Sequence, residues 1–176
     1  MLPRLLLKES MVRSYLLSFL ATRAAVLSAG FAKKYPGVWL VWEPGAWHAP
    51  ETGNARKTIA GFKPATTPSG SDALCFQLQL DAGKSAIKVG RDEKSDVCIN
   101  DATVSREHLT LQKGQADDWS ATPAKDRLVK KDGAPLPDAR PSPIIPGTKL
   151  ELGSVTLTFY DGSSFEKRVW GKSDKK

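Results

Sequence analysis

A glycine–arginine pair and a serine–arginine pair lie at the ends of two neighbouring apolar runs. Gly90 and Arg91 end the first run, and Ser105 and Arg106 lie just before the second. Arginine offers a planar fork of donors, and a serine hydroxyl offers one more. A phosphate group carries about 1.5–2 negative charges and three strong acceptor oxygens, so it suits this set of donors. Arg91 could offer a charge-assisted fork to such a group, Ser105 a hydroxyl donor, and Arg106 a second cation. Gly90 would let the chain turn tightly enough for Arg91 to face the loop.

The same stretch contains His108, which together with Ser105 brings nucleophilic catalysis into consideration. That chemistry needs a nucleophile, a base and a third group that orients the base. The sequence offers no convincing third member and no Gly-x-Ser-x-Gly turn. We predict that the protein is not an enzyme, and we interpret His108 as a packing residue beside a strand.

Metal and cofactor binding find no support in the sequence. The only cysteines and histidines are Cys75, Cys98, His48 and His108, and they show no spacing typical of zinc ligands. Asp101 is interpreted as a turn residue, because the region lacks the regular spacing of a calcium loop. We predict no metal and no cofactor.

The positive charge belongs mainly to the first part of the chain. The net charge is +7, of which residues 1–70 contribute +6 (9 Lys and Arg against 3 Asp and Glu) and residues 71–176 contribute +1 (17 against 16). Nucleic-acid binding needs a clustered positive field. We therefore predict no nucleic-acid partner for the second half.

Residues 73–165 have the pattern of an all-β domain. Short apolar runs such as ALCFQLQL, SAIKVG, EHLTLQ and KLELGSVTLTFY are separated by turn residues. No segment suggests a β–α–β unit. The sequence predicts a β-sandwich over residues 73–165, followed by a basic tail at residues 166–176.

Residues 1–34 are predicted to contain an amphipathic helix. The stretch from Glu9 to Phe31 has no proline, and its apolar residues gather on one side of a helical wheel: Val12, Leu16, Phe19, Leu20, Ala24 and Leu27. Arg13 and Arg23 interrupt the apolar run, which excludes the ~20 uncharged residues of a membrane span. Three interpretations stay open: a helix packed on its own domain, a helix on a membrane surface, and a transit peptide. We expect a cytoplasmic location, with membrane association through residues 1–34 as the alternative.

Residues 35–72 form a tryptophan-rich segment and a linker. The stretch GVWLVWEPGAW contains three of the five tryptophans, and Val38–Trp42 is predicted to be a short strand. Such aromatic side chains are expected to pack on the helix, on the following domain or on a partner. The later part is rich in Pro, Gly, Thr and Ser, and it offers three candidate phosphorylation sites, Thr58, Thr66 and Thr67.

The stretch GRDEKSDVCINDATVSREH resembles the signature of the forkhead-associated (FHA) domain family, and GTKLELGSVTLTFY is similar to the closing strands of that family. The resemblance covers roughly residues 73–162. It implies an all-β fold, a two-sheet FHA-type β-sandwich that recognises phosphothreonine peptides through loops at one end. It also implies that Arg91 and Ser105 contact the phosphate, that Arg106 is a further contact, and that His108 supports the binding loops.

The chain departs from the family at one point. Members of the family usually carry an Asn-Gly pair in a later loop, where the asparagine holds the peptide backbone. Here the closest match is Asp126-Arg127, and an aspartate cannot donate as an amide does. Asp126 and Arg127 are therefore candidate peptide contacts. The segment from Pro137 to Gly147 is a proline-rich insert.

Two functions follow from these observations. The first is a phosphothreonine-dependent adaptor in Ser/Thr kinase signalling, whose partner is a phosphothreonine-containing protein, either a kinase or a kinase substrate. A phosphothreonine of its own linker could also dock on the domain. The alternative is a degenerate FHA scaffold that binds a protein partner independently of phosphate, through the N-terminal helix and the tryptophan-rich segment.

Overall fold

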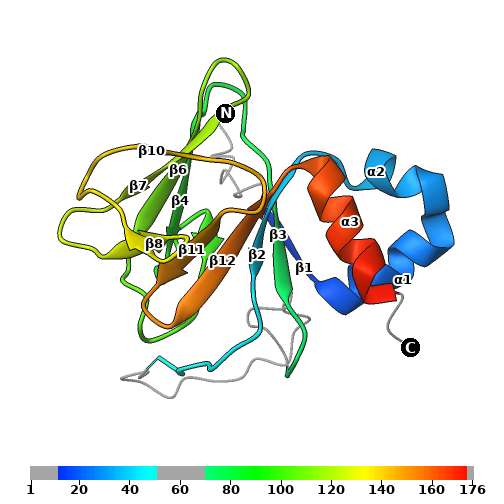
Figure 1. The fold of residues 1–176 in the computed structure, drawn as a ribbon, viewed down its shortest axis with the longest axis horizontal. Helices are drawn as coiled ribbons and strands as arrows, with labels where there is room; N and C mark the ends of the chain where they lie inside the picture. Colours follow the sequence, from blue (N-terminus) through cyan, green and yellow to red (C-terminus); the bar gives the residue numbers. More distant parts are fainter. Residues whose placement is uncertain (1–11, 51–69, 174–176) are drawn as a thin grey trace, which may run out of the picture.

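The computed structural model describes residues 12–50 and 70–173 (Figure 1). A seven-stranded sheet contains, in spatial order, β1 (Arg13–Leu16), β3 (Leu74–Leu78), β2 (Val38–Trp42), β12 (Val155–Tyr160), β11 (Lys149–Leu152), β8 (Val129–Lys131) and β9 (Ala134–Pro135). A five-stranded sheet contains β10 (Ser142–Ile144), β7 (Trp119–Pro123), β6 (Leu109–Lys113), β4 (Ala86–Gly90) and β5 (Val97–Cys98). The helical elements are α1 (Leu17–Leu27), the 3₁₀ helix η1 (Ser28–Gly30), α2 (Phe31–Lys34) and α3 (Gly162–Ser173).

The predicted two-sheet β-sandwich is confirmed. The two sheets face each other across an apolar core that includes Ile87, Leu111, Leu150 and Leu157. All strand pairs are antiparallel except β4 with β5, which run parallel. The predicted strand at Val38–Trp42 is present as β2.

The sandwich begins earlier in the chain than residue 73. Strand β2 pairs with both β3 and β12 in the middle of the larger sheet, and β1 pairs with β3 at its edge. Two of the seven strands of this sheet therefore come from the segments assigned to the N-terminal helix and the tryptophan-rich region. A fragment that starts at residue 73 would lack both strands.

Strand β2 is buried on both faces, which explains its unbroken apolar sequence VWLVW. Leu40 and Trp42 face the core between the sheets. Trp39 and Val41 face a second core, which the helices form over the outer face of the sheet. The Trp39 indole stacks on the ring of Phe165 from α3, with ring centroids 4.1 Å apart. Helix packing thus covers the tryptophan-rich strand.

The N-terminal helix packs on its own chain, which is one of the three interpretations left open. Leu17, Leu20 and Ala24 of α1 are buried in the second core, and the helices lie together at one side of the sandwich (Figure 1). The expected helix is wrong over residues 13–16, because these residues pair with β3 as a strand. Pairing with the sheet edge overrides the local helical periodicity there. Residues 9–11 lie outside the described residues. The predicted apolar face is also wrong at Phe19, whose side chain is 48% exposed.

The expected tail at residues 166–176 is replaced, up to Ser173, by most of helix α3. Asp161 caps this helix: its carboxylate accepts the Ser164 backbone N–H at 2.8 Å, and the Ser164 hydroxyl accepts the Asp161 N–H at 3.1 Å. Phe165 and Val169 then lie four residues apart on the buried face. The helix is therefore a structural part of the second core.

The proline-rich insert from Pro137 to Gly147 contains strand β10, which pairs with β7 at the edge of the smaller sheet. The candidate phosphorylation sites Thr58, Thr66 and Thr67 lie outside the described residues. Among the helices of residues 12–50 and 70–173, none is long and apolar enough to cross a membrane.

Candidate functional site

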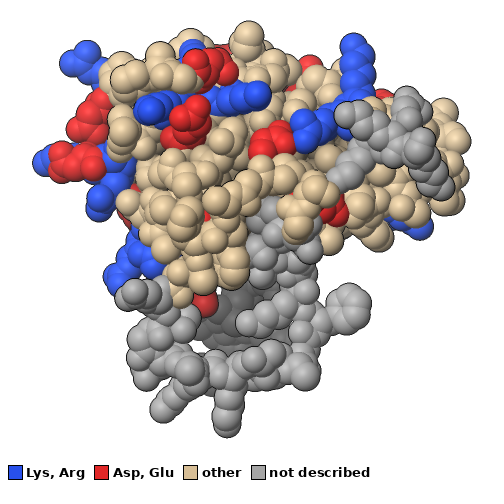
Figure 2. Space-filling model, turned by 60° about the horizontal axis from the view of Figure 1, so that its bottom comes forward, with Lys and Arg blue, Asp and Glu red and all other residues tan. Residues whose placement is uncertain are grey.

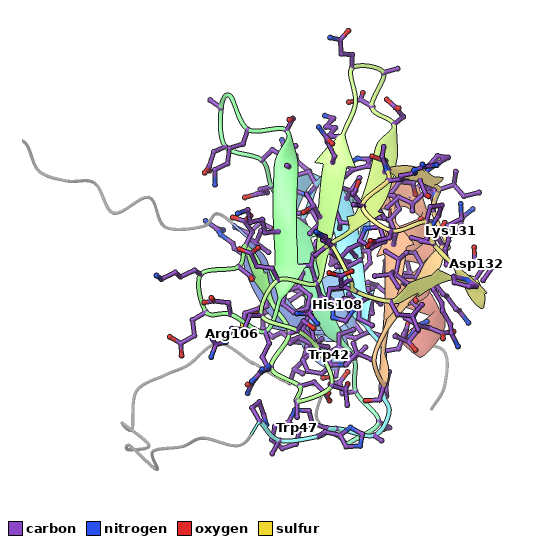
Figure 3. All side chains as sticks on the ribbon, turned by 90° about the vertical axis from the view of Figure 1, so that its left-hand side faces the viewer. Trp42, Trp47, Arg106, His108, Lys131 and Asp132 are labelled. Carbon is purple, nitrogen blue, oxygen red and sulfur yellow. The ribbon has the colours of Figure 1, made fainter. Side chains whose placement is uncertain are left out.

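The residues predicted to bind phosphate lie together at one end of the sandwich. Arg91 directly follows β4, while Ser105 and Arg106 lie in the loop between β5 and β6. Arg127 lies in the turn between β7 and β8. These four residues line one hollow, together with Glu107, Ala124 and Lys125, and we call it the first hollow. Figure 3 shows this end of the sandwich in the lower part of the view, where Arg106 is labelled.

Arg91 is held in place from both its backbone and its side chain. Its backbone N–H donates to the Ser105 carbonyl at 2.9 Å, and its Nε donates to the Val104 carbonyl at 3.0 Å. Within the described residues its guanidinium makes no ion pair, so the terminal nitrogens Nη1 and Nη2 remain available. The arginine is half-buried and anchored, which lowers the entropy lost when it binds an anion.

Ser105 and Arg106 have fixed backbones and available side chains. The Ser105 N–H donates to Nδ1 of His108 at 3.0 Å. The Arg106 carbonyl accepts the Asp92 N–H at 3.2 Å. Neither the Ser105 hydroxyl nor the Arg106 guanidinium has a hydrogen bond or ion pair in the part of the chain that the structure describes. Both groups are therefore free to meet a ligand.

Gly90 is required by close packing of two backbones. A Cβ atom at this position would lie 2.0 Å from the Arg106 carbonyl oxygen and 2.8 Å from its carbon. These are backbone atoms, so no side-chain movement can relieve the clash. The glycine allows β4 to approach the Ser105 loop, and this contact, rather than a left-handed turn, places Arg91 beside Ser105.

His108 joins two loops at the floor of the site. Its side chain is buried, Nδ1 accepts the Ser105 N–H, and Nε2 lies 3.0 Å from the Leu128 carbonyl. These partners require the neutral tautomer with the proton on Nε2. Burial lowers the pKa of His108; the hydrogen bond to Leu128 opposes this shift, and the nearby charge of Arg127 adds to it. The geometry agrees with a supporting role for His108.

The turn from Ala124 to Leu128 closes the site on its other side. The Arg127 N–H donates to the Ala124 carbonyl at 3.0 Å. Asp126 has a φ of 60°, and its N–H donates to the Asp138 carboxylate at 3.0 Å. Asp126 and Arg127 line a second hollow, which also includes Thr103, Ser105, His108, Leu128, Lys130, Glu151 and Gly153. Ser105 and Arg127 line both hollows, so the two adjoin each other.

The site carries a local positive charge. Arg91, Arg106, Lys125 and Arg127 line the first hollow with one acidic residue, Glu107. Figure 2 shows Lys and Arg side chains interspersed with Asp and Glu side chains on the upper and left parts of the view. This pattern suits a compact anion better than the extended backbone of a nucleic acid.

Residues 43–50, which we call the strap, also contribute to the site, and no sequence pattern predicted this contribution. The His48 N–H donates to the Asp101 carboxylate at 2.9 Å, and the Ala102 N–H donates to the His48 carbonyl at 2.8 Å. The Trp47 indole N–H donates to the Asn100 carbonyl at 2.6 Å. The strap therefore lies along the loop that carries Ser105. Nothing in the sequence links these two segments, which are more than 50 residues apart.

Asp101 anchors this arrangement. Its carboxylate is fully buried and also accepts the N–H and hydroxyl of Thr103 at 2.8 and 2.6 Å. Burial alone would raise the pKa of Asp101, but the bonds from Thr103 and His48 together hold it below its usual range. The interpretation of Asp101 as a turn residue agrees with these contacts.

Ser154, His48 and Asp101 do not form a catalytic triad. The Ser154 hydroxyl lies 3.0 Å from His48 Nδ1, and the nearest Asp101 oxygen lies 3.7 Å from the same nitrogen. A triad needs the serine and the carboxylate on opposite ring nitrogens. Among the described residues, no group of three or more His, Cys, Asp or Glu could hold a metal ion.

The three tryptophans of the tryptophan-rich segment differ in exposure. Trp39 and Trp42 are buried in the two cores, with exposed fractions of 0% and 3%. Only Trp47 of this segment presents a large surface, at 48% exposed. A partner of the folded chain could therefore use Trp47 but not the other two.

Comparison with known structures agrees with this fold. The N-terminal FHA domain of Rad53p from S. cerevisiae, solved with a phosphothreonine peptide, is 11% identical at a TM-score of 0.50. The alignment covers 76% of this chain and 99% of that domain. At this identity the likeness shows the fold alone.

Two further structures are similar. The FHA domain of CT664 from Chlamydia trachomatis is 18% identical at a TM-score of 0.48, with 72% of this chain and 98% of that chain covered. Rad53 1–466 in complex with AMP-PNP is 12% identical at a TM-score of 0.49, with 76% of this chain covered, but this chain spans only 32% of that longer one. A comparison with curated proteins gave no match. The model of the FHA domain family matches residues 87–168, from β4 to α3. The resemblance to the FHA domain family is therefore confirmed over residues 87–168.

Proposed function

We propose that this protein binds phosphothreonine-containing proteins through the first hollow. Support comes from one observation above all: anchored Arg91, the unpaired hydroxyl of Ser105 and exposed Arg106 line the same small depression. Two guanidinium groups and a hydroxyl match the charge and the acceptor oxygens of a phosphate monoester. The peptide bound to the FHA domain of Rad53p is in keeping with this proposal.

Arg127 supplies part of the contact to the peptide backbone that the missing asparagine makes in other members of the family. It lines both hollows, so its donors can reach a peptide that leaves the phosphate and enters the second hollow. Asp126 has no donor on its side chain, and its N–H is already bonded to Asp138. Of the two candidate peptide contacts, Arg127 is therefore the one that attracts the peptide, and Asp126 restricts which residues it accepts.

The biological role that fits this chemistry is an adaptor in Ser/Thr kinase signalling. Its partner is a kinase or a kinase substrate that carries phosphothreonine. Thr58, Thr66 and Thr67 of its own linker are candidate ligands, in the same chain or in another copy.

Calorimetry with the full chain tests the proposal. An oriented peptide library would be titrated in phosphothreonine, phosphoserine and unmodified forms. We expect micromolar binding of the phosphothreonine form only, and a loss of at least tenfold in Arg91→Ala, as for charge-assisted contacts. Arg13→Ala is the matched control. Arg13 is an exposed arginine on β1, where it pairs with Gln77, and it lines neither hollow. Equal affinity for phosphorylated and unmodified peptides would instead favour the phosphate-independent scaffold.

A further inference from the structure

The strap, which carries Trp47, is joined to the wall of the second hollow through His48. The second hollow is lined by Thr103 and Gly153. The Thr103 hydroxyl lies 3.0 Å from the hydroxyl of Ser154, which lies 3.0 Å from His48 Nδ1. Two hydrogen bonds therefore join the wall of the second hollow to the strap. Figure 3 shows Trp47 at the same end of the molecule as Arg106 and His108.

The strap is fixed in this position. Its backbone makes two hydrogen bonds to the loop. The His48 N–H donates to the Asp101 carboxylate, and the His48 carbonyl accepts the Ala102 N–H. The Asp101 carboxylate is fully buried under the strap, so the strap and the Ser105 loop form one unit. A rigid aromatic group loses little entropy when it takes up a ligand.

The exposed part of Trp47 is apolar. Its only polar atom, Nε1, already donates to the Asn100 carbonyl, and 48% of the residue remains exposed. Leu128, which lines the second hollow, is 62% exposed. In the described residues only five large apolar side chains are exposed, and two of them, Trp47 and Leu128, belong to this end of the sandwich. Apolar surface next to a polar site is typical of a recognition surface.

We infer that Trp47 is a specificity-determining residue, which receives an apolar side chain of the phosphothreonine peptide. This inference rests on the proposed function. A peptide in extended form advances about 3.3 Å per residue. Five extended residues span about 16 Å. We therefore expect the peptide side chain that meets Trp47 to lie within about five positions of the phosphothreonine. The strap lies before residues 87–168, the part of the chain that the family model matches.

The test is an oriented library with fixed phosphothreonine, followed by calorimetry on the full chain. We expect one position within five residues of the phosphothreonine to prefer an aromatic or branched aliphatic side chain. Replacement of that peptide residue by alanine should weaken wild-type binding about tenfold, the effect of burying one such side chain. In Trp47→Ala the same replacement should change the affinity less than twofold.

Two further variants separate contact from loop support. Trp47→Phe keeps the aromatic surface but loses the hydrogen bond to Asn100, so it should retain most of the preference. Phe19→Ala is the matched control, because Phe19 is an equally exposed aromatic residue (48%) on α1. It should leave both affinity and preference unchanged.

The outcomes distinguish this inference from the function it rests on. If wild type binds no phosphothreonine peptide, the proposed function fails and the inference fails with it. If wild type binds but shows no apolar preference, or if Trp47→Ala keeps that preference, the function stands and the inference is wrong. If Trp47→Phe loses affinity for all phosphopeptides as fully as Trp47→Ala does, Trp47 only supports the loop and the inference is again wrong.

Discussion

Replacing His108 by alanine should both destabilise the fold and weaken phosphopeptide binding. The imidazole joins the Ser105 N–H to the Leu128 carbonyl, which belong to the two loops that line both hollows. Removing it leaves two backbone groups without their partner and a gap below Ser105.

The expected size follows from these contacts. Each of the two hydrogen bonds contributes about 0.5–1.5 kcal/mol to the free energy of unfolding. Loss of the buried ring adds a packing cost, but His108 lines the second hollow, so water can enter the gap and satisfy the freed groups. We therefore expect a total loss of about 2–3 kcal/mol, below the 3–5 kcal/mol typical of a sealed aromatic core position.

Urea unfolding of wild type and His108→Ala measures this loss. Glu107→Ala is the control. Glu107 is the neighbouring residue, its side chain is 73% exposed, and its one ion pair among the described residues is a long surface contact of 3.9 Å between Oε1 and Lys88 Nζ. The control should change stability by less than about 0.5 kcal/mol. A loss below about 1 kcal/mol in His108→Ala, or a large loss with unchanged phosphopeptide affinity, would refute the idea that this imidazole positions Ser105.

Three further predictions concern the same end of the molecule. Gly90→Ala should destabilise the protein by about 3 kcal/mol or more, because its Cβ would lie 2.0 Å from a backbone atom. The control is Gly171→Ala in α3, whose Cβ would meet nothing within 4 Å, so it should be neutral or slightly stabilising. Thermal unfolding measures both variants. Asp101→Asn should cost about 1–3 kcal/mol near pH 7, since one acceptor that faces the His48 N–H becomes a donor. The pKa of Asp101 is lowered in the fold, so this cost should shrink as the pH falls below about 4 and through that lowered pKa, as urea unfolding at pH 7 and pH 3 would show. The pKa of His108 is also lowered in the fold, so the unfolded chain takes up the proton first as the pH falls. The stability difference between wild type and His108→Ala should therefore decrease as the pH drops from about 7 to 5. An increase would contradict a buried neutral imidazole.

The strands and the grouping of the residues proposed to bind phosphate were predictable because their signals are local. Alternation of apolar residues marks β2, β3, β4 and β6, and the spacing of Gly90-Arg91 and Ser105-Arg106 follows from strands that end at the same side of the sandwich. The role of Gly90 was predicted only in part. Its need for close backbone approach depends on Arg106, which lies 16 residues away.

Features that depend on distant partners were missed. Strand β1 looks helical in sequence and becomes a strand only because β3 offers it an open edge. The strap is held by Asn100, Asp101 and Ala102 through contacts that no local pattern predicts. Helix α3 did have a signal that was overlooked, since Asp161 and Ser164 form a capping pair before Phe165 and Val169.

The most direct test of the account is amide NMR of the full chain during titration with a phosphothreonine peptide. We expect the shifts to concentrate at residues 90–92, 103–108 and 124–128, and the unmodified peptide to produce none of them. Shifts that instead gather on α1, around exposed Phe19 and Val26, or that appear equally with the unmodified peptide, would contradict phosphate recognition at the first hollow.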